Sequence, residues 1–379
     1  MGIKIANRTR EKAILVGVAT RDTTSKQVKE HLAELGRLAD TAGAQVVAEV
    51  LQRRIAFDPS TLVGEGKARE IAALVETHKA DLVLFDEDLS GSQVKKLEEM
   101  IQCKVIDRSG IILDIFAKHA KTAEAMIQVE VAQLQYMLPR LTRAWTHLSR
   151  QAGGVGIGMK GPGETQLETD RRLVRKRIAD LKTKLEKVEG VRASQRERRS
   201  GVFHLAIVGY TNAGKSTLMN SLTQAGVVAA DQLFATLDPT TRKLWLGNHR
   251  HATLSDTVGF IRKLPVSLIS SFKSTLAVAA QASLILNLVD ASSDDFTEQM
   301  EITARVLNEL GILETPRMVI FNKIDLLEPD HAKQLGIQYP EAVLISAEKK
   351  IGLDMLRTKL CEAYDQAAYT ASVEAERKK

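Results

Sequence analysis

Apolar residues recur in short buried runs over the first third of the chain, and helical patterns separate the runs. Four of these runs predict buried strands, at residues 13–19, 44–50, 80–86 and 104–107. The helical spacing between the first two runs is carried by Val28, Leu32, Leu35, Leu38 and Ala42. Gly43 follows as a stop signal. Alternating strands and helices predict an α/β domain with a parallel sheet over residues 1–120.

The pattern changes over residues 121–200, where apolar residues recur at steps of three and four. The first series is Ile127, Val131, Leu134, Leu138, Leu141, Trp145 and Leu148. The second series is Leu167, Val174, Ile178, Leu181, Leu185 and Val188. These heptad-like seams predict two long helices that form an antiparallel hairpin. Pro139 should kink or restart the first helix.

The hairpin tip is predicted at residues 153–163, which contain six glycines and one proline. A helix through this segment would cost about 1 kcal/mol per glycine and about 3 kcal/mol for the proline. Gly156, Gly158 and Gly161 also match the G-x-G-x-x-G dinucleotide fingerprint. That fingerprint requires a preceding strand. A predicted helix precedes this segment, so a dinucleotide site is rejected.

Strand and helix signals alternate again over residues 201–365, with buried strands predicted at 203–208, 250–256, 283–289, 317–321 and 342–345. Residues 366–379 are polar and are expected to fray. The predicted architecture is therefore α/β: an N-terminal α/β domain, a helical hairpin and a third domain with its own sheet.

A phosphate-binding loop follows the strand at 203–208. The sequence GYTNAGKS fits G-x-x-x-x-G-K-[ST], and a helix is predicted to begin near its lysine. Backbone N–H groups at such a helix start surround a β-phosphate, the lysine adds a positive charge, and the serine hydroxyl binds Mg²⁺. The loop residues are Gly209, Tyr210, Thr211, Asn212, Ala213, Gly214, Lys215 and Ser216.

Three shorter motifs each follow a predicted strand. DTVG consists of Asp256, Thr257, Val258 and Gly259; its aspartate can hold Mg²⁺ through water, and its glycine N–H can contact a γ-phosphate. NKID consists of Asn322, Lys323, Ile324 and Asp325, and SAE consists of Ser346, Ala347 and Glu348. The Asp325 carboxylate can accept hydrogen bonds from guanine N1–H and N2–H, donors that adenine lacks. Together these motifs predict a P-loop GTPase that prefers GTP to ATP.

Phe260 occupies the position directly after the DTVG glycine, where Ras-like GTPases have a glutamine that orients the attacking water. Phenylalanine cannot hydrogen-bond to water. We therefore expect slow intrinsic hydrolysis and acceleration by a partner. Packing beneath the loop is a second role open to Phe260.

Charge points to an anionic partner. The net charge is +6, and twelve Lys or Arg but only four Asp or Glu lie between Arg171 and Arg199. A solvated helix face usually balances its charges, and this segment does not. A basic rod suits RNA phosphates, and the nearby aromatics, Tyr136 and Trp145, are too few for sequence-specific single-strand binding. A solvated face remains the alternative.

Composition narrows the class of protein. With 44% hydrophobic and 26% charged residues the chain is of globular type. It has no run of about 18 apolar residues and no apolar signal core, so we expect a cytoplasmic location and no stable membrane insertion. Cys103 and Cys361 are far apart in sequence and form no metal-ligand spacing.

Three longer stretches resemble the HflX family of ribosome-associated GTPases, within the translation-factor class. They are FATLDPTTR at 234–242 and the segments at 107–141 and 153–172, and the likeness covers about residues 12–365. The resemblance implies that Thr236 is the switch I threonine, which binds Mg²⁺ with Ser216 and Asp256. From the sequence alone Thr240 and Thr241 are rivals. Flanking nucleotide contacts are implied for Phe234, Ala235, Leu237 and Asp238.

The resemblance implies GTP, GDP and Mg²⁺ as ligands, and Lys215, Thr236 and Gly259 as the catalytic group. It also implies that a monomer binds ribosomal RNA on the 50S subunit and the 70S ribosome in ribosome dissociation, rescue or assembly. We expect no DNA partner. Some family members have been associated with ATP, but VGEGK at 63–67 is too short for a phosphate loop.

Two other functions are considered. An RNA-binding scaffold with a vestigial GTPase domain is the main alternative, although intact Lys215, Ser216, Asp256 and Asp325 argue against it. A metabolic NTPase or kinase would need a small-substrate site, and no His/Asp constellation suggests one.

Overall fold

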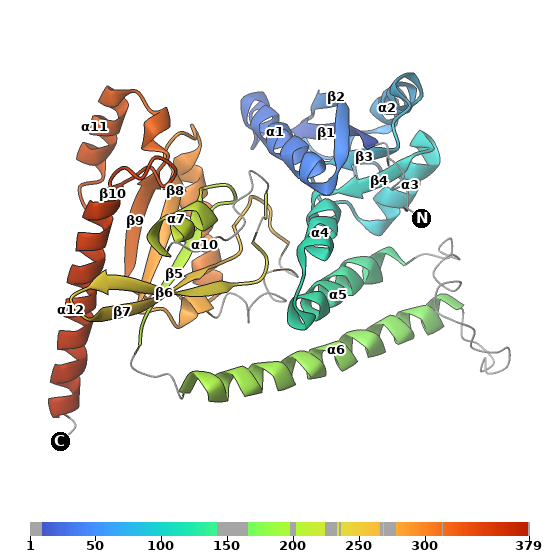
Figure 1. The fold of residues 1–379 in the computed structure, drawn as a ribbon. Coiled ribbons are helices and arrows are strands. Elements are labelled where there is room, and N and C mark those ends of the chain that lie inside the picture. The colour runs from blue at the N-terminus through green and yellow to red at the C-terminus, as the bar shows by residue number, and fades with distance from the viewer. Residues whose placement is uncertain are drawn as a thin grey trace, which may run out of the picture. The chain divides into compact units, whose positions relative to one another are not determined.

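Four parallel strands form the first sheet of the computed structural model, in the order β2-β1-β3-β4 (Figure 1). Each of these strands was predicted from its apolar run. The strands are β1 (Glu11–Ala19), β2 (Ala44–Arg53), β3 (Leu82–Phe85) and β4 (Lys104–Asp107). The helices between and after them are α1 (Ser25–Ala42), α2 (Glu65–His78), α3 (Gly91–Ile101) and α4 (Arg108–His119). The α/β prediction for this part of the chain is thus confirmed.

Helix α1 shows why the sequence forms this layer. Thr24 caps its N-terminus in a reciprocal pair with Gln27, and Gly43 ends it in the left-handed conformation, with φ of 91°. The predicted apolar face is buried, with Leu32, Leu35 and Leu38 at most 1% exposed. This face covers the sheet.

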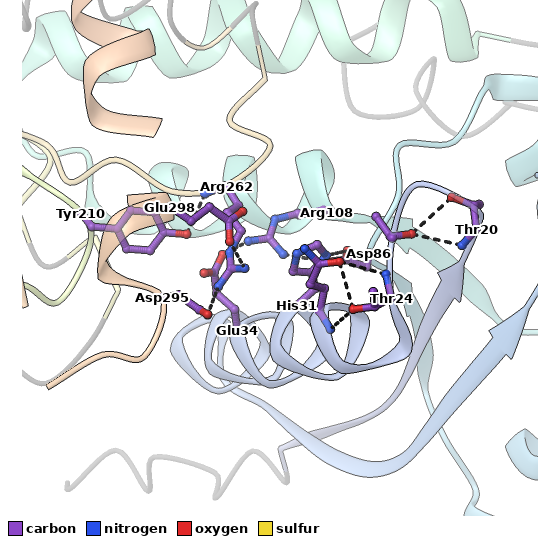
Figure 2. Close-up of polar contacts among 12 residues, drawn as sticks. Thr20, Thr24, His31, Glu34, Asp86, Arg108, Tyr210, Arg262, Asp295 and Glu298 are labelled. Carbon is purple, nitrogen blue, oxygen red and sulfur yellow. Dashed lines mark hydrogen bonds and ion pairs between the residues drawn. The ribbon is translucent and has the colours of Figure 1, made fainter. Parts of the chain in front are cut away.

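A buried ion cluster lies within the same α/β layer (Figure 2). The Arg108 guanidinium donates to Asp86 Oδ1 at 2.7 Å and also to Glu34, and all three side chains are at most 2% exposed. His31 Nδ1 lies 3.6 Å from Asp86 Oδ2. Each buried charge here has an opposite charge beside it, and this attraction offsets part of the desolvation cost of burial.

Helix α5 (Ala123–Met137) and helix α6 (Gln166–Glu197) follow the first sheet. Pro139 stops α5, since a 3-10 turn, η1 (Leu138–Arg140), replaces the helix there. Two contacts join these segments: the Arg177 guanidinium to Glu130 at 2.8 Å, and Arg171 to the Leu141 carbonyl at 3.2 Å.

The α6 seam is only partly as predicted. Leu181 is 1% exposed, and Val174, Ile178, Leu185 and Val188 are half-buried. The glycine-rich tip at 153–163, with Trp145 and Leu148, lies outside the described residues. The helical hairpin as a whole therefore stays a prediction.

A six-stranded sheet organises the C-terminal part of the chain, in the order β10-β9-β8-β5-β7-β6. All neighbours are parallel except β6 and β7, which are antiparallel. The strands are β5 (Phe203–Gly209), β6 (Thr240–Gly247), β7 (Arg250–Asp256), β8 (Leu284–Asp290), β9 (Arg317–Asn322) and β10 (Val343–Leu344). The named helices are α7 (Lys215–Thr223), α10 (Phe296–Glu309), α11 (Pro329–Gln338) and α12 (Leu353–Arg377), with the 3-10 turn η3 (Ile324–Leu326).

Two elements differ from expectation in this part. The edge strand β6 is not among the predicted strands. Helix α12 continues to Arg377 through residues expected to fray, and its first half packs Leu356 and Leu360 into the core of the sheet. Because packing fixes the first half of α12, the helix can continue into the polar segment.

Contacts divide the chain into two compact units, one of residues 1–118 with 129–184, the other of residues 119–128 with 185–379. The structure describes residues 10–141, 166–197, 202–223, 233–234, 236–265, 268, 278–312 and 314–377. No helix among these residues has both the length and the apolar character needed to span a membrane.

Candidate nucleotide site

The phosphate-binding loop turns tightly from β5 into α7. Gly214 has φ of 93°, and a Cβ atom added there would come 2.3 Å from Asn322 Nδ2. The loop therefore needs glycine at this position for both backbone conformation and space. The Lys215 ammonium donates to the carbonyls of Gly209 at 3.2 Å and Tyr210 at 2.8 Å, which holds it across the loop.

The three predicted metal-binding residues come together beside this loop. Ser216 Oγ and Thr236 Oγ1 both donate to Asp256 Oδ2, at 2.6 and 3.0 Å, and the two hydroxyls lie 2.9 Å apart. The rival threonines are elsewhere, because Thr240 and Thr241 begin β6, where Thr241 Oγ1 lies 2.6 Å from Ser255 Oγ. Thr236 is therefore the residue placed with Ser216.

The oxygen atoms of this group fit Mg²⁺. Asp256 is fully buried, and burial raises the pKa of its carboxyl, while Lys215 acts in the opposite direction. Within the described part of the chain, Asp256 Oδ1 and Thr211 Oγ1 are buried without a hydrogen-bond partner. Buried polar atoms are normally satisfied. A hard cation with its water ligands would satisfy the carboxylate oxygen, and a phosphate would satisfy the hydroxyl.

Raising the pH is expected to weaken nucleotide binding through Lys215. Burial lowers the pKa of this ammonium to about 8 in the nucleotide-free protein. Bound phosphates favour the charged form and raise the pKa again. Binding then takes up a proton above pH 8, so affinity should fall by up to about tenfold per pH unit. Titration of a fluorescent GTP analogue from about pH 7 to about pH 9 measures this effect.

Arginine provides the control for this titration. In Lys215→Arg the side chain stays charged over the whole range, so the decline with pH should disappear even where affinity is lower. A wild-type affinity that is constant across the range would contradict the assignment of the effect to Lys215.

The DTVG segment lies directly against the phosphate-binding loop. Thr257 Oγ1 donates to the Ile207 carbonyl at 2.7 Å, which fixes the segment to β5. The Phe260 amide donates to the Gly209 carbonyl at 3.1 Å, and the Thr211 amide donates to the Phe260 carbonyl at 2.7 Å. Phe260 is 1% exposed, so it packs within the protein. Its backbone holds the two loops together, while its side chain has no access to a water nucleophile.

Arg262 extends this connection, and the sequence analysis did not identify it. Its backbone N–H donates to the Tyr210 hydroxyl at 2.9 Å (Figure 2). Its guanidinium contacts Asp295 at 3.0 Å and Glu298 at 3.1 Å. The segment after Phe260 is thus fixed to the phosphate-binding loop and to α10. No short motif marks this arginine, because the partners of its guanidinium lie 33 and 36 residues away in sequence and are brought close only by the fold.

The base-recognition loops are joined by Asn322. Its Nδ2 donates to the Ala213 carbonyl at 2.8 Å, and its Oδ1 accepts from the Ala347 amide at 2.9 Å. This one side chain therefore joins the NKID segment to both the phosphate-binding loop and the SAE segment. Asp325 and Glu348 are exposed, whereas Ser346 and Ala347 are buried. Asp325 is therefore accessible to a ligand at the carboxyl edge of the sheet, and its role in base recognition stays a prediction.

The residues that flank Thr236 in sequence have different surroundings in the structure. Phe234 and Leu237 are each 2% exposed, so they anchor Thr236 by packing. Ala235 lies outside the described residues. The sequence predicts a nucleotide contact for Asp238, whereas in the structure both of its carboxylate oxygens accept hydrogen bonds at the start of α5.

The sequence is similar to those of known proteins along almost the whole chain. Three family profiles match: GTP-binding GTPase N-terminal at residues 29–117, GTP-binding GTPase Middle Region at 119–199, and 50S ribosome-binding GTPase at 204–323. The GTPase HflX of Caldanaerobacter subterraneus is 48% identical over 353 residues, which are 92% of this chain and 79% of that protein.

The chain belongs to the HflX family of GTPases. The GTPase HflX of Escherichia coli strain K12 is also similar, with 46% identity over 93% of this chain and 82% of that protein. As an HflX-family member the chain is a GTP-binding GTPase, which confirms the resemblance and the predicted nucleotide class.

A solved structure agrees on the fold. The crystal structure of an SsGBP–GDP complex has a TM-score of 0.51 and 23% identity, and covers 94% of this chain and 99% of that one. This likeness supports the α/β fold with a P-loop GTPase domain.

Proposed function

We propose that this HflX-family GTPase binds GTP with Mg²⁺ at the carboxyl edge of the six-stranded sheet and acts on the 50S ribosomal subunit. The observation that carries the nucleotide assignment is the convergence of Ser216, Thr236 and Asp256 within 3.0 Å of one another. Mg²⁺ is assigned from this oxygen set and from the unsatisfied Asp256 Oδ1.

The residues divide the work of hydrolysis. Lys215 supplies a positive charge beside the β- and γ-phosphates, and the Gly259 N–H donates to the γ-phosphate. When bound, Mg²⁺ stabilises negative charge that develops on the phosphate oxygens. Ser216 and Thr236 would ligate this ion, and Asp256 would hold its water. Asn322 fixes the base-recognition loop, and Asp325 accepts from the guanine base.

The attacking water lacks an orienting side chain at the usual position. Phe260 is buried and cannot supply a hydrogen bond. Hydrolysis in the free protein is therefore proposed to be slow, and the ribosome is proposed to complete the site. Removal of one well-placed polar group typically costs about 10² to 10³ in rate, so stimulation of that order is expected.

Helix α6 supports ribosomal RNA as the partner. Its exposed cations include Arg175, Lys176, Lys182, Lys184 and Lys187. Among the nearby cations, Arg177 already pairs with Glu130. Exposed lysines and arginines that lack matching carboxylates gain affinity for phosphate through release of counterions. An N-terminal α/β domain and the basic helical region would then engage the large subunit.

Reversal of two α6 charges tests this surface. The double variant Lys182→Glu/Lys187→Glu should bind 50S subunits about tenfold less tightly, with a shallower dependence on salt, by roughly two in log–log slope. The matched control is Arg305→Glu/Lys333→Glu, which changes net charge equally on exposed residues of α10 and α11. GTP affinity without ribosomes should be unchanged in both. Equal weakening by the two pairs would show that only overall charge matters.

The family membership does not favour an RNA-binding scaffold with a vestigial GTPase domain. The contacts among the side-chain oxygens of Ser216, Thr236 and Asp256 also argue against this alternative, because a domain that has lost catalysis does not need to keep them.

A further inference from the structure

The carboxylate of Asp238 binds the first residues of α5. The amides of Lys121 and Thr122 both donate to Asp238 Oδ2 at 3.1 Å, and the Thr122 hydroxyl donates to Oδ1. Thr122 in turn caps the helix, since its Oγ1 accepts from the Ala125 amide at 3.2 Å and its carbonyl accepts from the Met126 amide at 3.0 Å. The carboxylate thus satisfies backbone donors at the positive end of the helix.

Asp238 lies two residues after Thr236, one of the three proposed Mg²⁺-binding residues. Thr236 binds Asp256, Leu237 is 2% exposed in the core, and Asp238 binds the start of α5. These three consecutive residues are therefore fixed by three different partners. A short segment that is fixed at both ends cannot release one end without changing the strain at the other.

We propose that the start of α5 holds Thr236 in its metal-binding position through Asp238, and that Asp238 is a positioning residue for GTP hydrolysis. The inference rests on the proposed Mg²⁺ role of Thr236. In this proposal Thr236 would ligate Mg²⁺ only when the γ-phosphate is present, so that GTP strengthens the Asp238 contact and GDP does not. By thermodynamic reciprocity, an intact contact must favour GTP over GDP.

The helix that receives this contact extends beyond the unit that contains the nucleotide site. Residues 119–128 belong to that unit, and α5 continues without a break into residues assigned to the other unit. The state of the nucleotide would thereby be linked to the start of a helix whose Glu130 pairs with Arg177 of α6. The link needs only a change in capping at residues 121 and 122, which is a local order–disorder switch.

Two variants test the contact from its opposite sides. In Asp238→Ala, affinity for a non-hydrolysable GTP analogue with Mg²⁺ should fall about tenfold, within the usual range of coupling. Thr122→Val keeps the two backbone hydrogen bonds to Oδ2 and should give a smaller loss in the same direction. Affinity for GDP should stay within about twofold, because GDP does not require Thr236. Asp238→Asn keeps one acceptor oxygen and should give an intermediate loss. The double variant should be no worse than Asp238→Ala alone.

Hydrogen exchange provides the second readout in the free protein. Amides of residues 119–126 should exchange more slowly with the GTP analogue than with GDP in the wild type, and this difference should vanish in Asp238→Ala. The control Asp294→Ala, an exposed aspartate outside the site, should match the wild type. Unfolding temperatures identify any variant that is generally destabilised.

The proposal is overturned if both variants bind the GTP analogue as tightly as the wild type. It is equally overturned if Asp238→Ala weakens binding of the GTP analogue and of GDP to the same extent, because the contact would then not depend on the γ-phosphate. Neither result bears on the proposed function, since wild-type GTP binding and ribosome binding are measured separately.

Discussion

Replacement of Asp325 by asparagine is expected to change base preference from guanine to xanthine. The carboxylate is proposed to accept hydrogen bonds from guanine N1–H and N2–H, whereas asparagine offers one acceptor and one donor. Xanthine has an oxygen where guanine has its 2-amino group, so it matches the new pair. A site that loses a buried hydrogen-bond partner discriminates by roughly 10⁴ to 10⁵ in the most favourable cases. Competition between GTP and XTP for the protein measures the change.

Asp330→Asn is the matched control, because Asp330 is also exposed and lies five residues further along the chain. This control should keep the wild-type preference for GTP. An Asp325→Asn protein that still selects GTP over XTP would remove Asp325 from the base site.

Alanine at Gly259 is expected to lower the turnover of GTP by about 100-fold. An added Cβ would lie 2.8 Å from Thr211 Cγ2, 2.9 Å from Thr211 Cα and 2.9 Å from Lys215 Nζ. The Thr211 backbone cannot turn aside as a flexible side chain would, so the DTVG segment must move away from the phosphates. Because GDP lacks the γ-phosphate, the affinity of the variant for GDP should stay close to that of the wild type. Single-turnover hydrolysis and GDP titration separate the two effects.

Gly66→Ala serves as the control, since a Cβ there meets nothing within 4 Å and the residue lies in α2. It should leave hydrolysis unchanged and stabilise the helix by up to about 1 kcal/mol. Normal turnover in Gly259→Ala would mean that the close approach of this segment to the loop is not needed for catalysis.

The local pattern of apolar residues was sufficient to predict most of the strands. Runs such as residues 203–208 are both apolar and bounded by turn residues, so burial and strand geometry agree. Strand β6 escaped prediction because it lies at the edge of the sheet, where Arg242 and Lys243 are exposed and only Leu244 and Leu246 are buried. An edge strand with one covered face and charged residues carries a weak hydrophobic signal.

Short motifs predicted the candidate nucleotide site because each one follows a strand of the same parallel sheet. Parallel strands bring their carboxyl ends to one edge, so four segments that are distant in sequence meet there. The sequence does not predict hydrogen bonds between individual residues that are far apart along the chain. The Asp238 contact spans 116 residues and the Arg262 contact to Tyr210 spans 52, and neither pair has a local sequence signature.

Sedimentation tests most directly the proposed action on the 50S subunit, and it also tests whether the γ-phosphate controls binding to the ribosome. The wild-type protein would be centrifuged with purified 50S subunits, 30S subunits and 70S ribosomes, each with a non-hydrolysable GTP analogue, with GDP or without nucleotide. We expect the protein to be recovered with the large subunit in the presence of the GTP analogue, with little recovery in the other two states. Equal amounts of protein with the 50S subunit in all three states would contradict this expectation.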